Sequence, residues 1–220
     1  YYREIAARPR ERAQRDGVGT VTHATPIGHP VESILRAADQ VRADLIVLGA
    51  RERSTAHRVL VGSTSSGVAS LATVPVLVAR GRAPAEASAG DRPFDRIVVA
   101  VDRSPASGEA LARAISLSRA LAVPITVLTV VPRLRAAGMR TSEAERREAD
   151  ALQAAESLLA NARTLADRNG AREARVELMR GPPSEAILDY LDESESHLLV
   201  VGSRGLSPTR GLFLGSVSTA

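Results

Sequence analysis

Several residue types that carry common enzyme chemistry are absent from this sequence. It has no cysteine, so it can form neither a disulfide, a thiolate nucleophile nor a cysteine metal site. All 29 of its basic residues are arginine, and without lysine a Walker A loop and a Schiff-base mechanism are excluded. Aromatic residues make up only 2% of the chain, which leaves few side chains for stacking on nucleic-acid bases.

Long apolar runs and charge blocks are also missing. No run reaches the roughly 18–20 apolar residues that a membrane helix needs, and no signal-peptide pattern is present. The net charge is +4, but the arginine residues are interspersed with 25 acidic residues and are not gathered in one block of the sequence. We therefore expect a cytoplasmic protein that binds neither membrane nor nucleic acid, with a hydrophobic content of 44% that is ample for buried cores.

The chain contains an internal duplication. Residues 28–65 align without a gap with residues 181–218, which lie 153 positions later, and 14 of the 38 pairs are identical. Between the copies, residues 81–93 are rich in alanine, glycine and proline and show no apolar period, as is typical of a linker. We expect a first domain at 1–80, this linker, and a second domain at 94–220.

The second copy alternates short apolar runs with amphipathic stretches. The segment 96–101, which contains an apolar run at 97–101, and the segments 125–131, 176–179 and 197–201 predict parallel strands, and periods of three and four residues between them predict helices. Ser104-Pro105 favours the start of the first helix, and a capping-box pattern at Ser142 and Glu145 the start of the second. This βαβαβαβ order predicts a doubly wound α/β fold, Rossmann-like in type.

The first copy begins late in the same pattern. Residues 1–16 resemble the end of the long helix, 20–24 the third strand and 45–48 the fourth; 65–72 and 74–79 then predict a further helix and a fifth strand. Because the chain starts without methionine and stops soon after a glycine motif, we expect it to be truncated at both ends. The first domain would lack its N-terminal part, and the second its last helix and strand.

A glycine loop follows the fourth strand of the second copy. Gly202 and Gly205 are followed after nine residues by Gly215 and Ser216, which gives the spacing G-x2-G-x9-G-S. Glycines at the end of such a strand let backbone N–H groups approach a phosphate, and a helix beginning at Gly215 would present an anion site. In the first copy Glu52 occupies the position of Gly205.

The run at 96–102, the strand at 127–131 and this glycine loop together resemble the universal stress protein family. The resemblance implies a stress-response protein that binds ATP, alone or with Mg2+, and works as a homodimer or as a pseudo-dimer of its two domains. Asp102 and Val130 would then lie on the base and ribose side. The residues implied at the ribose and phosphates are Gly202, Arg204, Gly205, Gly215, Ser216 and Val217.

Two alternatives stay open beside this binding function. The protein could be a slow ATP hydrolase or phosphotransfer protein, although the sequence shows no persuasive general base. It could also be a dimerisation scaffold without nucleotide, in which the glycines serve only the turns. His23, His29, His57 and His197 have no metal-ligand spacing, so we expect neither a catalytic nor a metal site.

Overall fold

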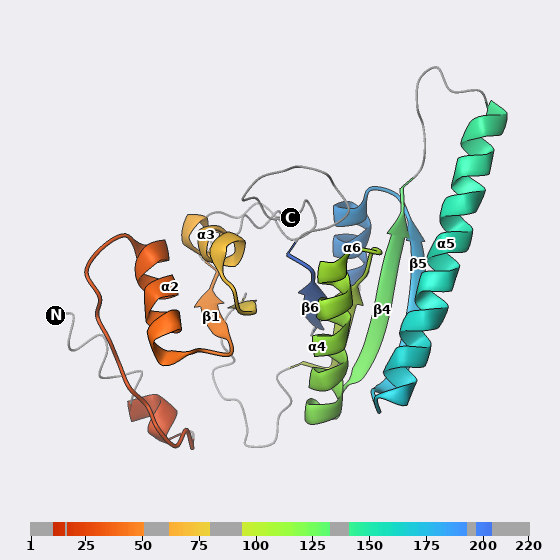
Figure 1. Cartoon of the computed structure of the whole chain (residues 1–220). Helices are drawn as coiled ribbons and strands as arrows, with labels where there is room; N and C mark the ends of the chain where they lie inside the picture. Colours follow the sequence, from red (N-terminus) through yellow and green to blue (C-terminus); the bar gives the residue numbers. More distant parts are fainter. Residues whose placement is uncertain are drawn as a thin grey trace. The chain divides into compact units, whose positions relative to one another are not determined.

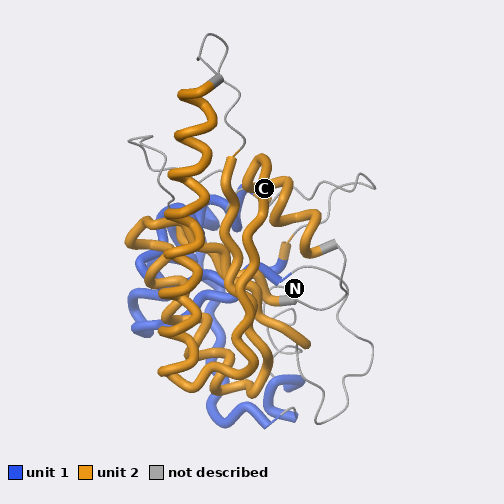
Figure 2. Tube along the Cα trace, turned by 90° about the vertical axis from the view of Figure 1, so that its right-hand side faces the viewer, with its two compact units in different colours: residues 1–49, 63–79 blue, residues 50–62, 80–220 orange. Residues whose placement is uncertain are grey.

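The computed structural model describes residues 11–15, 17–50, 62–79, 94–132, 141–192 and 197–203. The chain forms two compact units, coloured separately in Figure 2. Unit 1 comprises residues 1–49 and 63–79, and unit 2 comprises residues 50–62 and 80–220. The expected linker at 81–93 lies outside the described residues.

Unit 2 is built on a four-stranded parallel sheet (Figure 1). Its strands stand in the order β5-β4-β3-β6. Their bounds are β3 Arg96–Ala100, β4 Pro124–Val131, β5 Arg172–Arg180 and β6 His197–Val201. The doubly wound α/β fold predicted from the alternating pattern is thereby confirmed. β5 begins four residues before the predicted run, because its charged first residues continue the pairing with β4.

Three helices cover the two faces of this sheet. α4 (Pro105–Leu121) and α5 (Thr141–Arg168) pack on one face, over a core that includes Ile97, Val99 and Val127. α6 (Pro183–Asp192) packs on the other face, where Ile187 contacts a cluster with Val98 and Leu128. The two central strands, β3 and β4, are buried from both sides, which explains their largely apolar sequence, whereas the edge strand β5 is half-buried or exposed and carries charged residues.

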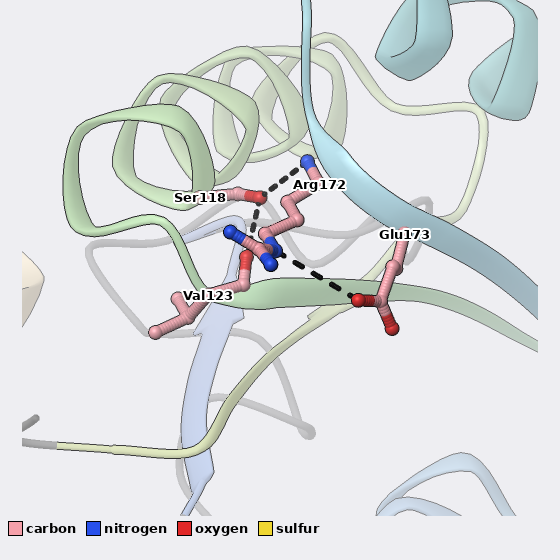
Figure 3. Close-up of polar contacts among 4 residues, drawn as sticks. All are labelled: Ser118, Val123, Arg172 and Glu173. Carbon is pink, nitrogen blue, oxygen red and sulfur yellow. Dashed lines mark hydrogen bonds and ion pairs between the residues drawn. The ribbon is translucent and has the colours of Figure 1, made fainter.

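A buried serine joins the ends of three elements where β4 and β5 begin, as Figure 3 shows. The Ser118 hydroxyl is fully buried and donates a hydrogen bond of 2.7 Å to the carbonyl of Val123. The backbone N–H of Arg172 donates to the same hydroxyl at 3.2 Å. Glu173 adopts a positive φ of 45° where the pairing of β5 with β4 is irregular. Ser118 therefore links the C-terminal end of α4 to the starts of β4 and β5.

Among its described residues, unit 1 has two strands and two longer helices, besides a short helical segment at residues 11–15. α2 (Pro30–Val41) and α3 (Ser63–Leu71) pack together with a parallel pair of strands, β1 (Ile46–Gly49) and β2 (Val76–Ala79). Val31, Ile46 and Val68 form its buried core. The strands and helix predicted near residues 45–48, 65–72 and 74–79 are confirmed, and residues 11–15 are helical.

The strand predicted at residues 20–24 is wrong, because these residues form no strand in the structure. In unit 2 the corresponding strand, β5, is held by its pairing with β4. The described part of unit 1 contains no strand in the place of β4. An apolar alternation without a neighbouring strand has no ladder of hydrogen bonds to stabilise it.

The duplication is visible in the backbone as well as in the sequence. Gly28 and Gly181, which align with each other, both have a φ of 141°, and each lies two residues before the proline that begins α2 or α6. An L-residue rarely adopts this φ, so both copies need glycine here to turn the chain into the helix. The two copies therefore share this local geometry.

Candidate functional site

The carboxyl ends of β3 and β6 mark a topological switch point in unit 2. From β3 the chain crosses to β4 through α4 on one face of the sheet, whereas α6 on the other face leads into β6, on the opposite side of β3. Ligands of doubly wound folds bind in the crevice outside such strand ends. Asp102 follows β3 by two residues, and Gly202 immediately follows β6. Two of the predicted site residues thus flank the switch point.

Asp102 is tied to the start of α4. Its Oδ1 atom accepts a hydrogen bond of 3.0 Å from the backbone N–H of Ser104 and another from the Ser104 hydroxyl. Ser104 in turn caps the helix, since its Oγ accepts from the N–H of Ser107 at 3.2 Å. The carboxylate is therefore fixed at the N-terminal end of α4, where the helix dipole favours negative charge.

Two further hydroxyl groups hold the backbone at these strand ends. The Thr129 hydroxyl on β4 donates a hydrogen bond of 2.8 Å to the carbonyl of Val101. The Ser107 hydroxyl lies 2.9 Å from the carbonyl of Ser104 and 3.4 Å from that of Asp102. Both hydroxyls belong to buried residues. The loop between β3 and α4 is thus fastened from the neighbouring strand and from the helix.

Gly202 lies directly against the first turn of α4. A Cβ atom at this position would be 2.8 Å from the carbonyl carbon of Ala106 and 2.9 Å from the backbone nitrogen of Ser107. Real Cβ atoms do not approach backbone so closely, so only glycine fits between β6 and α4. This packing accounts for a glycine at 202 whether or not a ligand lies beside it.

Val130 lies near the end of β4 and is half-buried. It pairs in register with Met179 of β5 and packs against the cluster of Val98, Leu128 and Ile187. Its side chain therefore lies on the α6 face of the sheet. An apolar group at this edge can contact the face of a planar ring.

The rest of the predicted site lies outside the described residues: Arg204, Gly205, Gly215, Ser216 and Val217. Glu52 of the first copy also lies outside them. Within the described ranges, no group of three acidic or histidine side chains is arranged to hold a metal ion. Among the described residues, hollows lie on the surface of α5 around Gln153 and between α4 and α5 beside Arg119, away from the strand ends.

Ser104, Ser107 and Thr129 lie beside the candidate site, although the sequence motifs point to Ser104 only as a helix start and do not point to the other two. The spacing Asp-x-Ser before a helix is itself a signal, because an aspartate side chain readily accepts from the backbone two residues later. Thr129 had no such signal. Its hydrogen bond joins positions 28 residues apart, and only the pairing of β3 with β4 brings them together.

None of the helices in the described part of the chain combines the length and the apolar composition that crossing a bilayer requires. This result concerns only those residues.

Known proteins with similar sequences include universal stress proteins of two bacteria. The universal stress protein YxiE of Bacillus subtilis is 29% identical over 136 residues, which cover 57% of this chain and 89% of that protein. A universal stress protein of Mycobacterium tuberculosis strain H37Rv is 36% identical over 75 residues, 34% of this chain. That match spans about half the length of the mycobacterial relative, or 51%.

Solved structures of universal stress proteins have the same fold. One from Archaeoglobus fulgidus matches with a TM-score of 0.65 and 24% identity, over 97% of this chain and 68% of that one. The UspA protein of Lactobacillus plantarum matches with a TM-score of 0.53 and 23% identity, over 58% of this chain and 90% of that one. Similarity at these identities establishes the fold alone.

The match to the family itself extends over nearly the whole sequence. The sequence model of the universal stress protein family matches the chain twice, at residues 2–80 and at residues 93–220. These two segments correspond to the two copies found by internal alignment. The chain therefore belongs to the universal stress protein family, with two successive matches to its domain.

Proposed function

We propose that the second domain binds ATP at the strand ends of unit 2 and that the protein is a stress-response regulator. The observation that carries this proposal is the position of Asp102 and Gly202 on either side of the switch point between β3 and β6. The glycine loop begins at this point of the chain. The first domain, with Glu52 in the loop, is proposed to be mainly a structural partner.

Asp102 is proposed to accept hydrogen bonds from ribose hydroxyls or from the amino group of adenine. A carboxylate has two oxygens, and each of them can accept more than one hydrogen bond. Fixing this group through the helix cap prepares it for the ligand without further ordering. Val130 would contact the base or ribose.

The loop residues are proposed to hold the ribose and the phosphates. Backbone N–H groups at glycines and at a helix start suit a polyanion, and an arginine adds a charge-assisted donor. These residues are Gly202, Arg204, Gly205, Gly215, Ser216 and Val217. Mg2+ would neutralise part of the phosphate charge.

The proposed mechanism is regulation through binding. A nucleotide with higher affinity for one conformation or one assembly state shifts the population toward that state. The shift is limited by the difference between the two affinities, and rapid turnover of ATP is not needed. Quantifying ADP released over hours from the pure protein with ATP tests the enzymatic alternative directly.

The binding proposal is tested by substituting Asp102 in two ways. Asn at 102 keeps an oxygen that can accept from Ser104 but removes the charge, whereas Ala removes both. We expect Asp102→Asn to weaken ATP binding about tenfold, or about 1.4 kcal/mol, with little change in unfolding temperature. Asp102→Ala should lower the unfolding temperature as well, because the hydrogen bonds that Asp102 accepts from the capping residue Ser104 are lost. Calorimetric titration and thermal unfolding measure these two effects separately.

A nucleotide-free scaffold is the second candidate, and the contact of Gly202 with α4 favours it. That contact explains one glycine of the motif without any ligand. The two candidates differ in a thermal shift experiment, since a ligand that binds only the folded state must stabilise it. No shift with millimolar ATP, with or without Mg2+, would favour the scaffold and contradict the ATP proposal.

For assembly, we propose a homodimer or, in a protein that contains the fifth strand of both domains, a pseudo-dimer of the two domains formed through these strands. β2 is an apolar strand paired with β1, and Pro75 directly before it suits the edge of a sheet. Sedimentation over a range of protein concentrations, with and without ATP, distinguishes a concentration-dependent dimer from an intramolecular pair.

A further inference from the structure

Val101 is the residue before Asp102, and β4 holds it through two hydrogen bonds. Its backbone N–H donates to the carbonyl of Leu128 at 2.8 Å, which continues the parallel ladder between β3 and β4. Its carbonyl accepts a hydrogen bond of 2.8 Å from the hydroxyl of Thr129. A side chain of β4 thus holds the peptide group that joins Val101 to Asp102, at the point where β3 has ended.

This hydrogen bond lies in apolar surroundings. Thr129 and Val101 are both buried, and Val101 belongs to the core cluster with Ile97 and Val127. A carbonyl group that is removed from water in such a place needs a hydrogen-bond donor, because leaving it without one is costly. The Thr129 hydroxyl therefore favours one orientation of the peptide group that leads into Asp102.

We propose that Thr129 is a positioning residue for Asp102 and thereby determines the affinity of the nucleotide site. This inference rests on the proposed binding of ATP at Asp102. The peptide plane that Thr129 holds sets the direction in which the backbone enters Asp102, and with it the direction of the carboxylate. Side chains alternate along a strand, so Thr129 lies on the opposite face of β4 from Val130. Thr129 acts through Asp102 and does not touch the ligand.

The carboxylate of Asp102 is supported from two sides. Thr129 holds the backbone before it, and the N–H of Ser104 donates to its Oδ1 atom at 3.0 Å. Without the first support the carboxylate samples further orientations, and the apparent affinity falls with the fraction of molecules in the competent one. One hydrogen bond between neutral groups biases such an equilibrium by about fivefold. Because Ser104 remains in place, we expect a loss of about three- to fivefold.

The test compares two buried threonines of the same strand. Thr129→Val removes the hydroxyl but keeps a branched side chain, and Thr129→Ser keeps the hydroxyl. Thr126→Val is the matched control, since Thr126 is fully buried near the start of β4, where its hydroxyl accepts from Arg96 at 3.4 Å. Calorimetric titration of the full chain with ATP should give an affinity about three- to fivefold lower for Thr129→Val. Thr129→Ser and Thr126→Val should stay within about twofold of the unmodified protein.

The position of the carboxylate is measured without nucleotide through Ser104, whose N–H donates to Asp102. Hydrogen exchange of this amide, followed by NMR, should be faster in Thr129→Val than in Thr126→Val. Thermal unfolding of both variants gives their loss of stability. A purely structural role of Thr129 would lower the unfolding temperature but would leave the exchange of the Ser104 amide and the ATP affinity like those of the control.

A second comparison shows whether Thr129 acts through Asp102. In an Asp102→Ala background no carboxylate remains to be positioned, so Thr129→Val should change the affinity by less than about twofold. An equal loss in both backgrounds, or unchanged ATP affinity of Thr129→Val in a chain that binds ATP, would overturn the inference. Absence of ATP binding by the unmodified chain would instead contradict the proposed function. Faster exchange at Ser104 in Thr129→Val would then still support the positioning of Asp102 by Thr129, and unchanged exchange would overturn it.

Discussion

The strands β1 and β6 come from aligned segments of the chain, yet only one of them is covered on both sides. Their inner faces are packed alike: Ile46 lies against the helices of unit 1, and Leu199 packs in the cluster beside α6. On the outer side, Val200 packs in the α4 cluster, whereas Val47 is 59% exposed. The apolar pattern of a segment thus specifies a strand with two faces to bury. Which faces become buried depends on elements elsewhere in the chain.

The largest expected difference between the two copies is in ATP affinity. Gly205 belongs to the second copy, and the first has Glu52 at the equivalent position. A carboxylate close to the phosphates is repelled, and its larger side chain keeps backbone N–H groups away from them. We expect Gly205→Glu to lower ATP affinity at least about 100-fold, or about 2.7 kcal/mol.

Calorimetric titration of the unmodified protein should show one tight site. Glu52→Gly is the reciprocal variant, and it should either leave this stoichiometry unchanged or add a weaker second site. Two equal sites in the unmodified protein, or tight binding that survives Gly205→Glu, would show that the active copy was assigned wrongly.

The next expected difference is in stability. It is measured by the change in the free energy of unfolding when Gly202, or its counterpart Gly49, is replaced by alanine. Gly202→Ala places a Cβ against the backbone of α4, and overpacking of this kind costs about 1–3 kcal/mol. Gly49→Ala meets open space and should change the free energy of unfolding by less than about 0.5 kcal/mol. Denaturant unfolding of the two variants measures both values. Equal effects would mean that β1 and β6 have equivalent surroundings, contrary to the exposures given above.

A smaller effect is expected where the helices of unit 1 meet. A Cβ on Gly67 of α3 would be 2.9 Å from a methyl group of Val31 on α2, so alanine should destabilise unit 1 by about 1 kcal/mol. In the second copy, the positions 153 residues later hold Ser184 in place of valine and Ala220 in place of glycine. One residue is therefore smaller and the other larger than in unit 1.

This pair of differences suggests a test of the contact between Val31 and Gly67. In a double-mutant cycle, Val31→Ser should rescue Gly67→Ala, with a coupling of about 0.5–1 kcal/mol measured by thermal unfolding. Additive effects of the two substitutions would show that the close approach of these helices does not limit the residue at position 67.

The elements of unit 2 could be predicted from the sequence because each has its own local signal. β3 contains most of the apolar run at 97–101, and α4 begins where Ser104 and Pro105 favour a helix start. The same criteria wrongly predicted a strand at residues 20–24, which form none in the structure. Its pattern was adequate, but a strand also needs a neighbour, and that requirement is not contained in a short segment.

The candidate site could be predicted only in part. The position of Asp102 after β3 follows from the strand pattern, and its contacts with Ser104 follow from their spacing. The role of Gly202 could not be obtained in this way. Its contact with Ala106 joins residues 96 positions apart, and it arises only because β6 lies beside β3. A glycine needed for packing and one needed for a phosphate look the same in a sequence.

A small effect of opposite sign is expected at a glycine within α4 that packs against nothing. Gly108 lies in the first half of α4 on its exposed side, and a Cβ there would meet no atom within 4 Å. Alanine has a higher helix propensity than glycine and loses less backbone entropy on folding, so Gly108→Ala should stabilise unit 2 by about 0.5–1 kcal/mol. The sign is opposite to that expected for Gly202→Ala, although both positions are near the same turn of the helix. Thermal unfolding of the two single variants measures this contrast. Destabilisation by Gly108→Ala would mean that the outer side of α4 is itself covered in the folded protein.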